Sequence, residues 1–249
     1  SQVQFAKIAR AELSHRIRRR PGAPPKQTIR VMIDYYRSAV LRLRQRHKFL
    51  SFDETELKEK RFIYFPLHKE PEFAINYSAP LWHQQIHTAH LIASSLPYGY
   101  ELLVREHRFN VGRRPMSYYR QLTELPATKL VDAFDDQFKY LKHANLIVTE
   151  NGSSGWEGVL LKRQVLTLAD SFYDAPDLVR RLDSPERLPE TLVEMLGGGT
   201  RARVSDDDIA LFVEAEFRAT FGEKDHTAAF DSLDRILSEI SAPHHKAAL

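Results

Sequence analysis

The stretch Asn145–Tyr173 reads NLIVTENGSSGWEGVLLKRQVLTLADSFY, and its pattern predicts the fold of the chain. The apolar run at 145–149 predicts a strand, and the Asn, Gly and Ser residues of 151–155 predict a turn that ends in helix N-cap residues. Residues 156–162 have helical spacing, and 164–168 are again apolar. Strand, turn, helix and strand in this order form a βαβ unit, so we expect a parallel sheet.

The turn at 151–155 is a candidate anion site. Backbone N–H groups at the start of a helix lack intrahelical acceptors, and the helix dipole favours negative charge there. Glu157 follows in what we predict to be the first helical turn, where its carboxylate would accept hydrogen bonds from sugar hydroxyls. The alternative is that the glycines only form the turn and that Glu157 is an ordinary first-turn acid stabilised by the helix dipole.

Length and composition indicate a globular protein. A chain of 249 residues with 43% apolar residues can form one large domain or two small ones. No apolar run approaches the roughly 20 residues that cross a bilayer, and the arginine-rich beginning does not read as a secretory signal. The absence of cysteine excludes disulfides, thiolate zinc sites and cysteine nucleophiles, and it fits the cytoplasm.

Positive charge is concentrated in residues 1–48, which hold 13 Lys and Arg against Glu12 and Asp34. Of the net charge of +3, this segment therefore carries +11 and the remainder −8. Residues 28–48 have the spacing of an amphipathic helix, with these candidate inward positions: Ile29, Met32, Ile33, Tyr36, Val40 and Leu43. The basic face either attracts an anionic glycan or the inner membrane surface, or is simply solvated. Nucleic acid is not expected, because no zinc-finger, RNA-binding or helix-turn-helix pattern is present.

Three regions follow from these patterns: a basic helical segment with a linker over 1–60, an α/β domain over 61–180 and a helical region over 181–249. In the α/β domain we predict further strands at 61–65, 101–105 and 129–132, and helices at 81–96 and 136–143. We take 53–60 as the charged linker. The helical region is predicted at 185–196, at 209–221 after an N-cap at Ser205, and at 226–240.

Polar residues follow three of the predicted strands. They are His68, Glu70 and Glu72 after the first strand, Glu106 and His107 after the second, and Asn151 to Glu157 after the fourth. Ligands of open parallel sheets bind beyond the carboxyl ends of the strands, so we expect these residues to converge. Alternatively, they are ordinary exposed loop residues. Walker, HExxH and GxSxG motifs are absent, which argues against P-loop, zincin and α/β-hydrolase chemistry, and we expect no metal.

These segments resemble the capsule polysaccharide biosynthesis proteins, which are bacterial glycosyltransferases that include Kdo transferases. The resemblance covers about Arg61 to Tyr173 and lies in the order and spacing of its blocks. The blocks are Phe62–His68 with Pro71 and Glu72, the helix with Gln84 or Gln85, Leu96–Tyr100, Val104–His107 and Val148–Glu157.

The resemblance implies the Rossmann-like, C-terminal half of a GT-B glycosyltransferase, with a nucleotide sugar such as CMP-Kdo as donor and no cofactor. A polysaccharide or glycolipid would be the acceptor. The implied catalytic candidates are His68, Glu72 and His107. The implied substrate-binding residues are Glu70, Gln85, Arg105, Glu106, Asn151, Gly152, Ser153, Ser154, Gly155 and Glu157. Helix N–H groups with His107, Arg105 or Arg108 would stabilise the leaving nucleotide without a metal.

Two departures bear on these implications. Arg108 stands where the family has proline after Glu-His, so the loop shape and the choice of donor can differ. Residues 1–48 are too few for the acceptor-side domain, so we expect a fragment or a short divergent protein. The alternative functions are a non-catalytic module that binds an anionic glycan, membrane surface or partner transferase through its basic helices, and a sugar-nucleotide epimerase.

Overall fold

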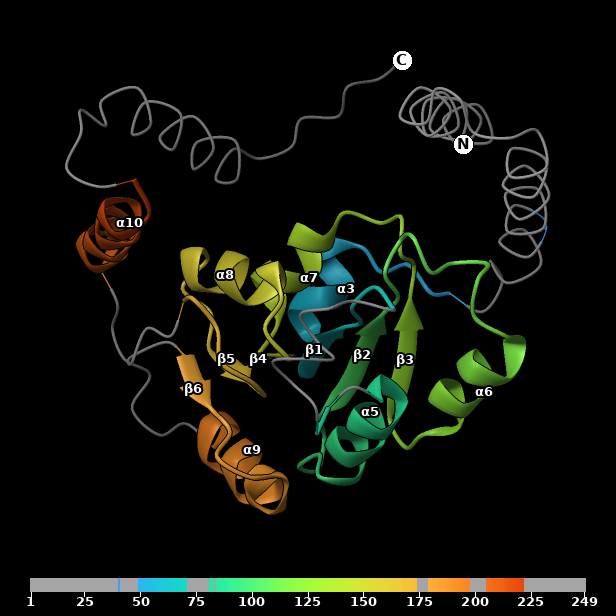
Figure 1. Ribbon diagram of the computed structural model, residues 1–249. Helices are drawn as coiled ribbons and strands as arrows, with labels where there is room; N and C mark the ends of the chain where they lie inside the picture. The colour runs from blue at the N-terminus through green and yellow to red at the C-terminus, as the bar shows by residue number, and fades with distance from the viewer. Residues whose placement is uncertain are drawn as a thin grey trace, which may run out of the picture.

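The computed structural model describes residue 40 and residues 49–70, 81–82, 84–173, 179–197 and 205–221. Within these ranges the chain forms a six-stranded parallel sheet between two layers of helices (Figure 1). This arrangement confirms the predicted Rossmann-like α/β fold. The predicted basic helices within 1–48, apart from residue 40, and the predicted helix at 226–240 lie outside the described residues.

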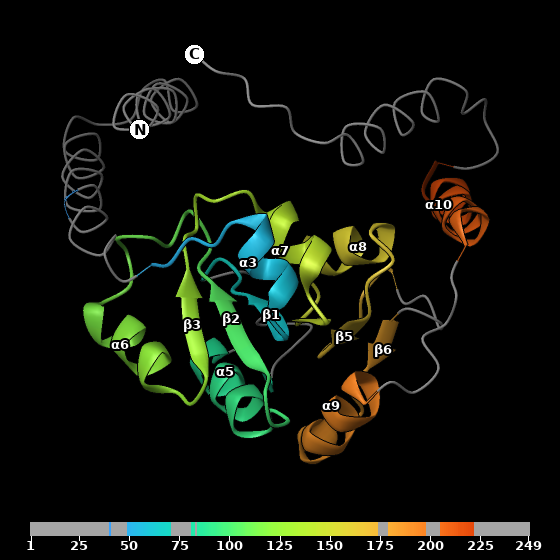
Figure 2. The ribbon, with the colours of Figure 1, turned by 180° about the vertical axis from the view of Figure 1, so that it is seen from behind.

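The sheet has the strand order β3-β2-β1-β4-β5-β6. Its strands are β1 (Phe62–Pro66), β2 (Glu101–Arg105), β3 (Thr128–Val131), β4 (Leu146–Thr149), β5 (Val165–Thr167) and β6 (Val179–Arg181). The helices are α3 (Glu54–Glu59), α5 (Gln85–Ser94), α6 (Met116–Glu124), α7 (Gln137–His143), α8 (Ser153–Leu160), α9 (Leu188–Leu196, after the 3-10 turn η2 at Pro185–Arg187) and α10 (Asp206–Phe221). Side chains of α5, α6 and α9 pack on one face of the sheet, and those of α3, α7, α8 and α10 on the other (Figure 2).

The central strand β1 contributes to both hydrophobic cores. Ile63 and Phe65 point into the core under α5, α6 and α9, whereas Phe62 and Tyr64 point into the core under α3, α7 and α8. All five of its residues are buried. A parallel strand that is covered on both faces needs apolar side chains at every position, which is why this strand reads as a continuous apolar run.

The order of the strands creates a switch point between β1 and β4. Strand β1 pairs with β2 on one side and with β4 on the other. The chain leaves β1 through α5 and leaves β4 through α8, and these two helices lie on opposite faces of the sheet (Figures 1 and 2). The two loops therefore diverge, and the space beyond the strand ends at this point is where open α/β sheets bind ligands.

The prediction of a linker at 53–60 is wrong. These residues include α3, whose start is fixed by a capping box: Glu56 N donates to Asp53 Oδ1 and Asp53 N donates to Glu56 Oε2, both at 2.8 Å. Leu57 is fully buried, and Leu50 bridges to Val131 of the edge strand β3. The segment from 49 to 60 is therefore part of the sheet domain.

Three other differences concern the ends and the number of elements. The helix predicted at 81–96 is α5 and begins at Gln85, so Leu81 is 75% exposed, and Leu91 is 38% exposed instead of facing inward. Helix α6 was not predicted, although Tyr119 and Leu122 have the three-residue spacing of its buried face. Strand β6 has three residues, which is too short for a periodicity to be visible.

Glycines at three-residue intervals let α8 approach the sheet. Gly152, Gly155 and Gly158 precede or lie within α8. A Cβ on Gly158 would lie 2.5 Å from Ile147 Cδ1, and one on Gly155 would overlap the hydroxyl and ring carbons of Tyr173. Gly155 and Gly158 are therefore required by close helix packing, and not only by the turn as the simpler alternative proposed.

We predict that Gly158→Ala destabilises the protein. Alanine favours a helix over glycine by about 1 kcal/mol, but overpacking a filled core costs about 1–3 kcal/mol. Urea denaturation of the variant measures the net change in the free energy of unfolding. Ile147→Val removes the Cδ1 atom that meets the new methyl group, so Gly158→Ala should cost less in the Ile147→Val background. An equal cost in both backgrounds would contradict the packing explanation.

Candidate functional site

The ends of β1 and β4 bring together, at the switch point, the polar clusters that follow the first and the fourth predicted strands. His68 Nε2 lies 3.3 Å from Thr149 Oγ1 and 3.4 Å from Glu150 Oε2. A Cβ on Gly152 would lie 2.7 Å from His68 Cε1, so the imidazole rests against the turn that precedes α8. The predicted convergence of these two clusters is therefore confirmed. Burial, and to a lesser extent the charge of His107, lowers the pKa of His68 to about 4.

Gln85 holds the loop after β1 in place. Its Oε1 accepts a hydrogen bond from His68 N at 2.5 Å, and its Nε2 donates to His68 O at 3.3 Å and to the Glu70 carboxylate. The side chain is 1% exposed. Gln85 therefore supports His68 and Glu70 from the protein side, and its predicted contact with substrate stays a prediction.

Arg114 joins the loops that follow β1 and β2. Its Nε lies 2.8 Å from Glu106 Oε2, and its Nη1 lies 2.9 Å from Glu70 Oε2. The guanidinium also stacks on the ring of Tyr118 in α6. Glu106 is fully buried, and burial raises its pKa to about 7 although the charge of Arg114 lowers it. The predicted substrate contact of Glu106 stays a prediction, because its carboxylate is engaged with Arg114 and His107 N.

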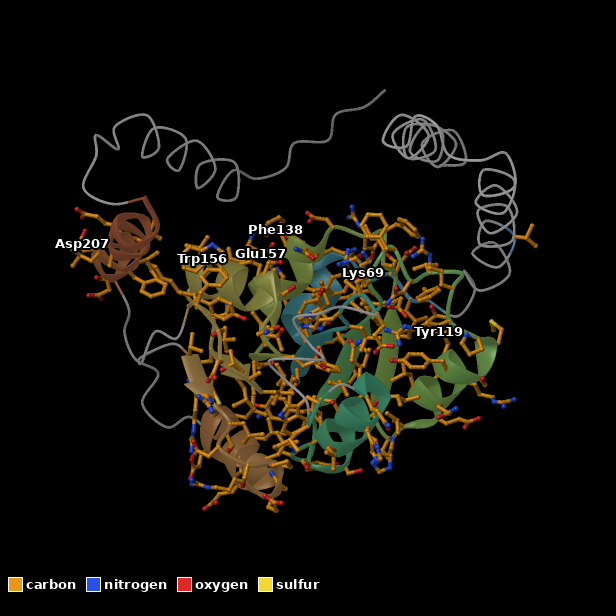
Figure 3. The ribbon with its side chains drawn as sticks, in the orientation of Figure 1. Lys69, Tyr119, Phe138, Trp156, Glu157 and Asp207 are labelled. Carbon is orange, nitrogen blue, oxygen red and sulfur yellow. The ribbon has the colours of Figure 1, made fainter. Side chains whose placement is uncertain are left out.

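His107 lies beside several positive charges at the same edge. Its ring stacks on Phe109 at 5.5 Å, and Phe109 N donates to its Nδ1 at 3.3 Å. Burial and the charges of Arg105, Lys69, Arg108 and Arg114 lower the pKa of His107, which favours the neutral form of the ring. Figure 3 labels Lys69 in this region, close to the carboxyl ends of the central strands.

Arg105, Gln137 and Glu157 form a second cluster, on the α7 and α8 side of the sheet. Arg105 is 7% exposed and donates from Nη2 to Ala133 O at 2.7 Å and to Asp135 O at 3.0 Å. Its Nη1 donates to Gln137 Oε1 at 3.0 Å, and Gln137 Nε2 donates to Glu157 Oε2 at 2.5 Å. Burial raises the pKa of Glu157 to about 7, against the charge of Arg105 and the bond from Gln137.

Helix α8 begins earlier than we predicted, at Ser153. Glu157 therefore lies in the second turn. Its predicted place in the first turn is wrong, and so is the alternative of a first-turn acid stabilised by the helix dipole. Gly152 N donates to Thr149 Oγ1 and Gly155 N donates to Gly152 O. Because the first N–H groups of a helix have no intrahelical acceptor, those of Ser153 and Ser154 are the candidates for an anion. Asn151 is half-buried in the same turn.

Glu72 is the remaining predicted site residue. It belongs to the segment 71–80, which is outside the described residues, so its place and role stay predictions. Sequence reasoning missed Arg114, Gln137, Thr149 and Glu150. Glu150 directly follows a predicted strand and could have been found by the same rule as its neighbours. In the part of the chain that the structure describes, no helix is long and apolar enough to cross a membrane.

No protein-family model and no curated protein matches the chain. Solved structures match with low identity. The structure of S. aureus MnaA with UDP is 13% identical, with 80% of this chain and 50% of that chain covered and a TM-score of 0.43. The spinosyn rhamnosyltransferase SpnG is 15% identical, with 70% and 45% covered and a TM-score of 0.41. Thermosulfurimonas dismutans KpsC, a β-Kdo 2,7 transferase, is 13% identical, with 84% and 67% covered and a TM-score of 0.42.

These likenesses concern the fold alone. Kdo transferases, the class that the sequence blocks resemble, are among the structures that match. The chain spans about half the length of several of the matching structures.

We predict that Arg114→Met strongly destabilises the protein, because it leaves the buried Glu106 without its positive partner. Removing one member of a buried ion pair costs about 3–5 kcal/mol. Without Arg114 the pKa of Glu106 rises further, so the folded variant binds a proton that the unfolded chain releases, and its stability falls as pH rises. Urea denaturation at pH 6 and pH 8 should show the larger loss at pH 8.

The neighbouring Arg113 is exposed and provides the matched control. Arg113→Met should change stability by less than about 0.5 kcal/mol. Adding Glu106→Gln to Arg114→Met should remove the extra loss at pH 8. A loss in Arg114→Met that is the same at both pH values would argue against an uncompensated buried charge.

We also predict that His68 makes stability depend on pH between about 4 and 6.5. The folded pKa of about 4 lies below the ordinary value of 6.5, so in this window the unfolded chain binds a proton that the folded chain does not. Stability conferred by neutral His68 is complete above 6.5 and is lost as pH falls, at up to about 1.4 kcal/mol per pH unit. Denaturation curves of the wild type should show a steeper loss than those of His68→Asn. If the free energy of unfolding depends on pH in the same way in the wild type and in His68→Asn, His68 is not the group responsible.

Proposed function

We propose that the chain carries the nucleotide-sugar-binding half of a GT-B glycosyltransferase that moves a sugar from an activated donor to a surface polysaccharide or its lipid linker. The observation that supports this most is the gathering of His68, the 149–152 turn, Glu106 and His107 beyond the carboxyl ends of neighbouring parallel strands. This is where folds of this class bind nucleotides. The order of the sequence blocks that resemble capsule glycosyltransferases supports the same class.

In this proposal the start of α8 binds the donor phosphate. The N–H groups of Ser153 and Ser154 and the helix dipole would favour the negative charge. His68 lies against the same turn, and an anion there would raise its pKa, so that the imidazole could share a proton with the phosphate. Arg105 and His107 would add positive charge or hydrogen bonds as the leaving nucleotide becomes more negative.

Glu157 would accept hydrogen bonds from the ribose. It stands one turn beyond the phosphate-binding N–H groups, and one of its two oxygens is already held by Gln137. The acceptor hydroxyl must lose a proton, for which His68, Glu70 and Glu72 are the candidate bases. Glu70 is bound to Arg114 and Gln85, which orients its carboxylate.

The finer features of the proposal come from the resemblance and from the charge pattern. CMP-Kdo would be the donor, and catalysis would need no metal or cofactor. The basic segment 1–48 would attach the protein to the cytoplasmic side of the inner membrane by attraction to anionic lipids, each basic residue near the surface adding about 1 kcal/mol.

The test of the proposed function is Glu157→Gln. Losing a hydrogen bond to a charged group costs about 1.5–3 kcal/mol, so nucleotide affinity should fall about tenfold or more. Calorimetric titration with CMP, UDP and their sugar conjugates, carried out at pH 8 where Glu157 is ionised, measures this loss. A transferase should prefer one nucleotide, whereas a non-catalytic module has no reason to do so.

Glu124→Gln is the matched control, since the side chain of Glu124 is exposed and its helix α6 lies at the opposite end of the sheet domain from α8 (Figure 1). It should leave both nucleotide affinity and melting temperature unchanged. If Glu157→Gln alters the melting temperature and leaves nucleotide affinity untouched, the start of α8 is not the donor site.

A further inference from the structure

Gln137, the first residue of α7, connects the last residue of β2 to the middle of α8. It accepts a hydrogen bond from Arg105 Nη1 at 3.0 Å and donates one to Glu157 Oε2 at 2.5 Å. The side chains thus form a continuous chain of two hydrogen bonds from a buried guanidinium to the Glu157 carboxylate. Figure 3 shows Glu157 where α8 meets α7, with Phe138, the neighbour of Gln137, labelled beside it.

The orientation of the Gln137 amide is determined by Arg105. A guanidinium can only donate hydrogen bonds, so the amide oxygen must face Arg105 and the amide N–H₂ must face Glu157. A reversed amide would place donors against donors on one side and an oxygen against a carboxylate on the other. Arg105 is itself fixed by the carbonyl oxygens of Ala133 and Asp135 and is 7% exposed.

This chain of bonds fixes how Glu157 presents its carboxylate. Oε2 is held by Gln137, so Oε1 is the oxygen that a ligand hydroxyl would meet. A carboxylate that is already held loses less side-chain freedom when it binds a ligand. Binding a ligand that lacks the hydroxyl would leave this largely buried carboxylate oxygen without a donor, which costs free energy. The loss of affinity for such a ligand is therefore larger than it would be at a mobile acid on the surface.

We infer that Gln137 is a positioning residue which sets the Glu157 carboxylate for a sugar hydroxyl, and that the site therefore selects ribonucleotides over 2′-deoxyribonucleotides. This inference rests on the proposed function. The inference gives a role to Gln137, which lies outside the sequence blocks that resemble the capsule glycosyltransferases. It also names a class of ligand that the site rejects, the 2′-deoxyribonucleotides. The simpler explanation is that Gln137 only ties α7 to α8.

The experiment compares the binding of CMP and 2′-deoxy-CMP, and of UDP and 2′-deoxy-UDP, by calorimetry on the full chain at pH 8. The wild type should bind its preferred ribonucleotide about tenfold or more tightly than the deoxy form, as expected for the loss of a hydrogen bond to a charged group. Gln137→Met keeps the size of the side chain and removes both hydrogen bonds. It should weaken ribonucleotide binding, leave deoxynucleotide binding nearly unchanged and bring the ratio towards one.

Two further variants separate positioning from stability. Gln121→Met changes an exposed glutamine on α6 and should leave the ratio and the melting temperature unchanged. The double variant Gln137→Met/Glu157→Gln should have a ratio of ribonucleotide to deoxynucleotide affinity no lower than that of Glu157→Gln alone. The reason is that both changes act on the same hydrogen bond to the ligand.

The outcomes distinguish the inference from the proposed function. If Gln137→Met lowers the melting temperature but keeps the wild-type ratio of ribonucleotide to deoxynucleotide affinity, Gln137 only connects α7 to α8. That result would overturn the inference. Equal binding of ribo- and deoxynucleotides by the wild type would overturn it as well, while leaving the proposed function in place. If the wild type binds none of these nucleotides, the proposed function fails and the inference fails with it.

Discussion

The burial of β1 on both faces is the constraint on which the rest of the structure depends. Phe62 and Tyr64 fill one core and Ile63 and Phe65 fill the other, so the strand carries apolar and aromatic side chains and no charged one. A strand of this kind needs helices on both sides, and parallel neighbours supply them through their crossover connections. Polar groups are therefore displaced to the strand ends, and because all strands run the same way, those ends meet at one edge.

The charged residues at this edge are held by other charged or polar groups of the protein. Arg114 binds Glu106 and Glu70 on the α5 and α6 side, and Arg105 binds Gln137 and two carbonyl oxygens on the α7 side. Isolated buried charges are costly, so each of these contacts offsets the loss of hydration. The charged side chains around the switch point are therefore already held by the protein, and a side chain that is already held loses less freedom when it binds a ligand.

The start of α8 combines packing and proposed function in the same few residues. Gly158 lets the helix lie close to Ile147, Gly155 accommodates the ring of Tyr173, and Tyr173 in turn donates to Gly152 O at 2.7 Å. These contacts place the first N–H groups of the helix beside His68 with little freedom to move. A Gly/Ser turn read from sequence alone would have been assigned to phosphate binding or to turn formation, whereas close packing explains two of the glycines without a ligand.

The sequence by itself determined five of the six strands that the structure describes and their common direction, because continuous apolar runs with helical segments between them have few other solutions. It also determined that His68 and the 149–152 turn would meet, since residues after parallel strands share an edge. Only the tertiary structure decided which polar groups face one another. Arg114 lies eight residues beyond Glu106, and Gln137 lies twenty residues before Glu157, so neither pairing has a local periodicity. Such contacts depend on how loops and helices dock in three dimensions, and that docking is set by core packing, which no local pattern records.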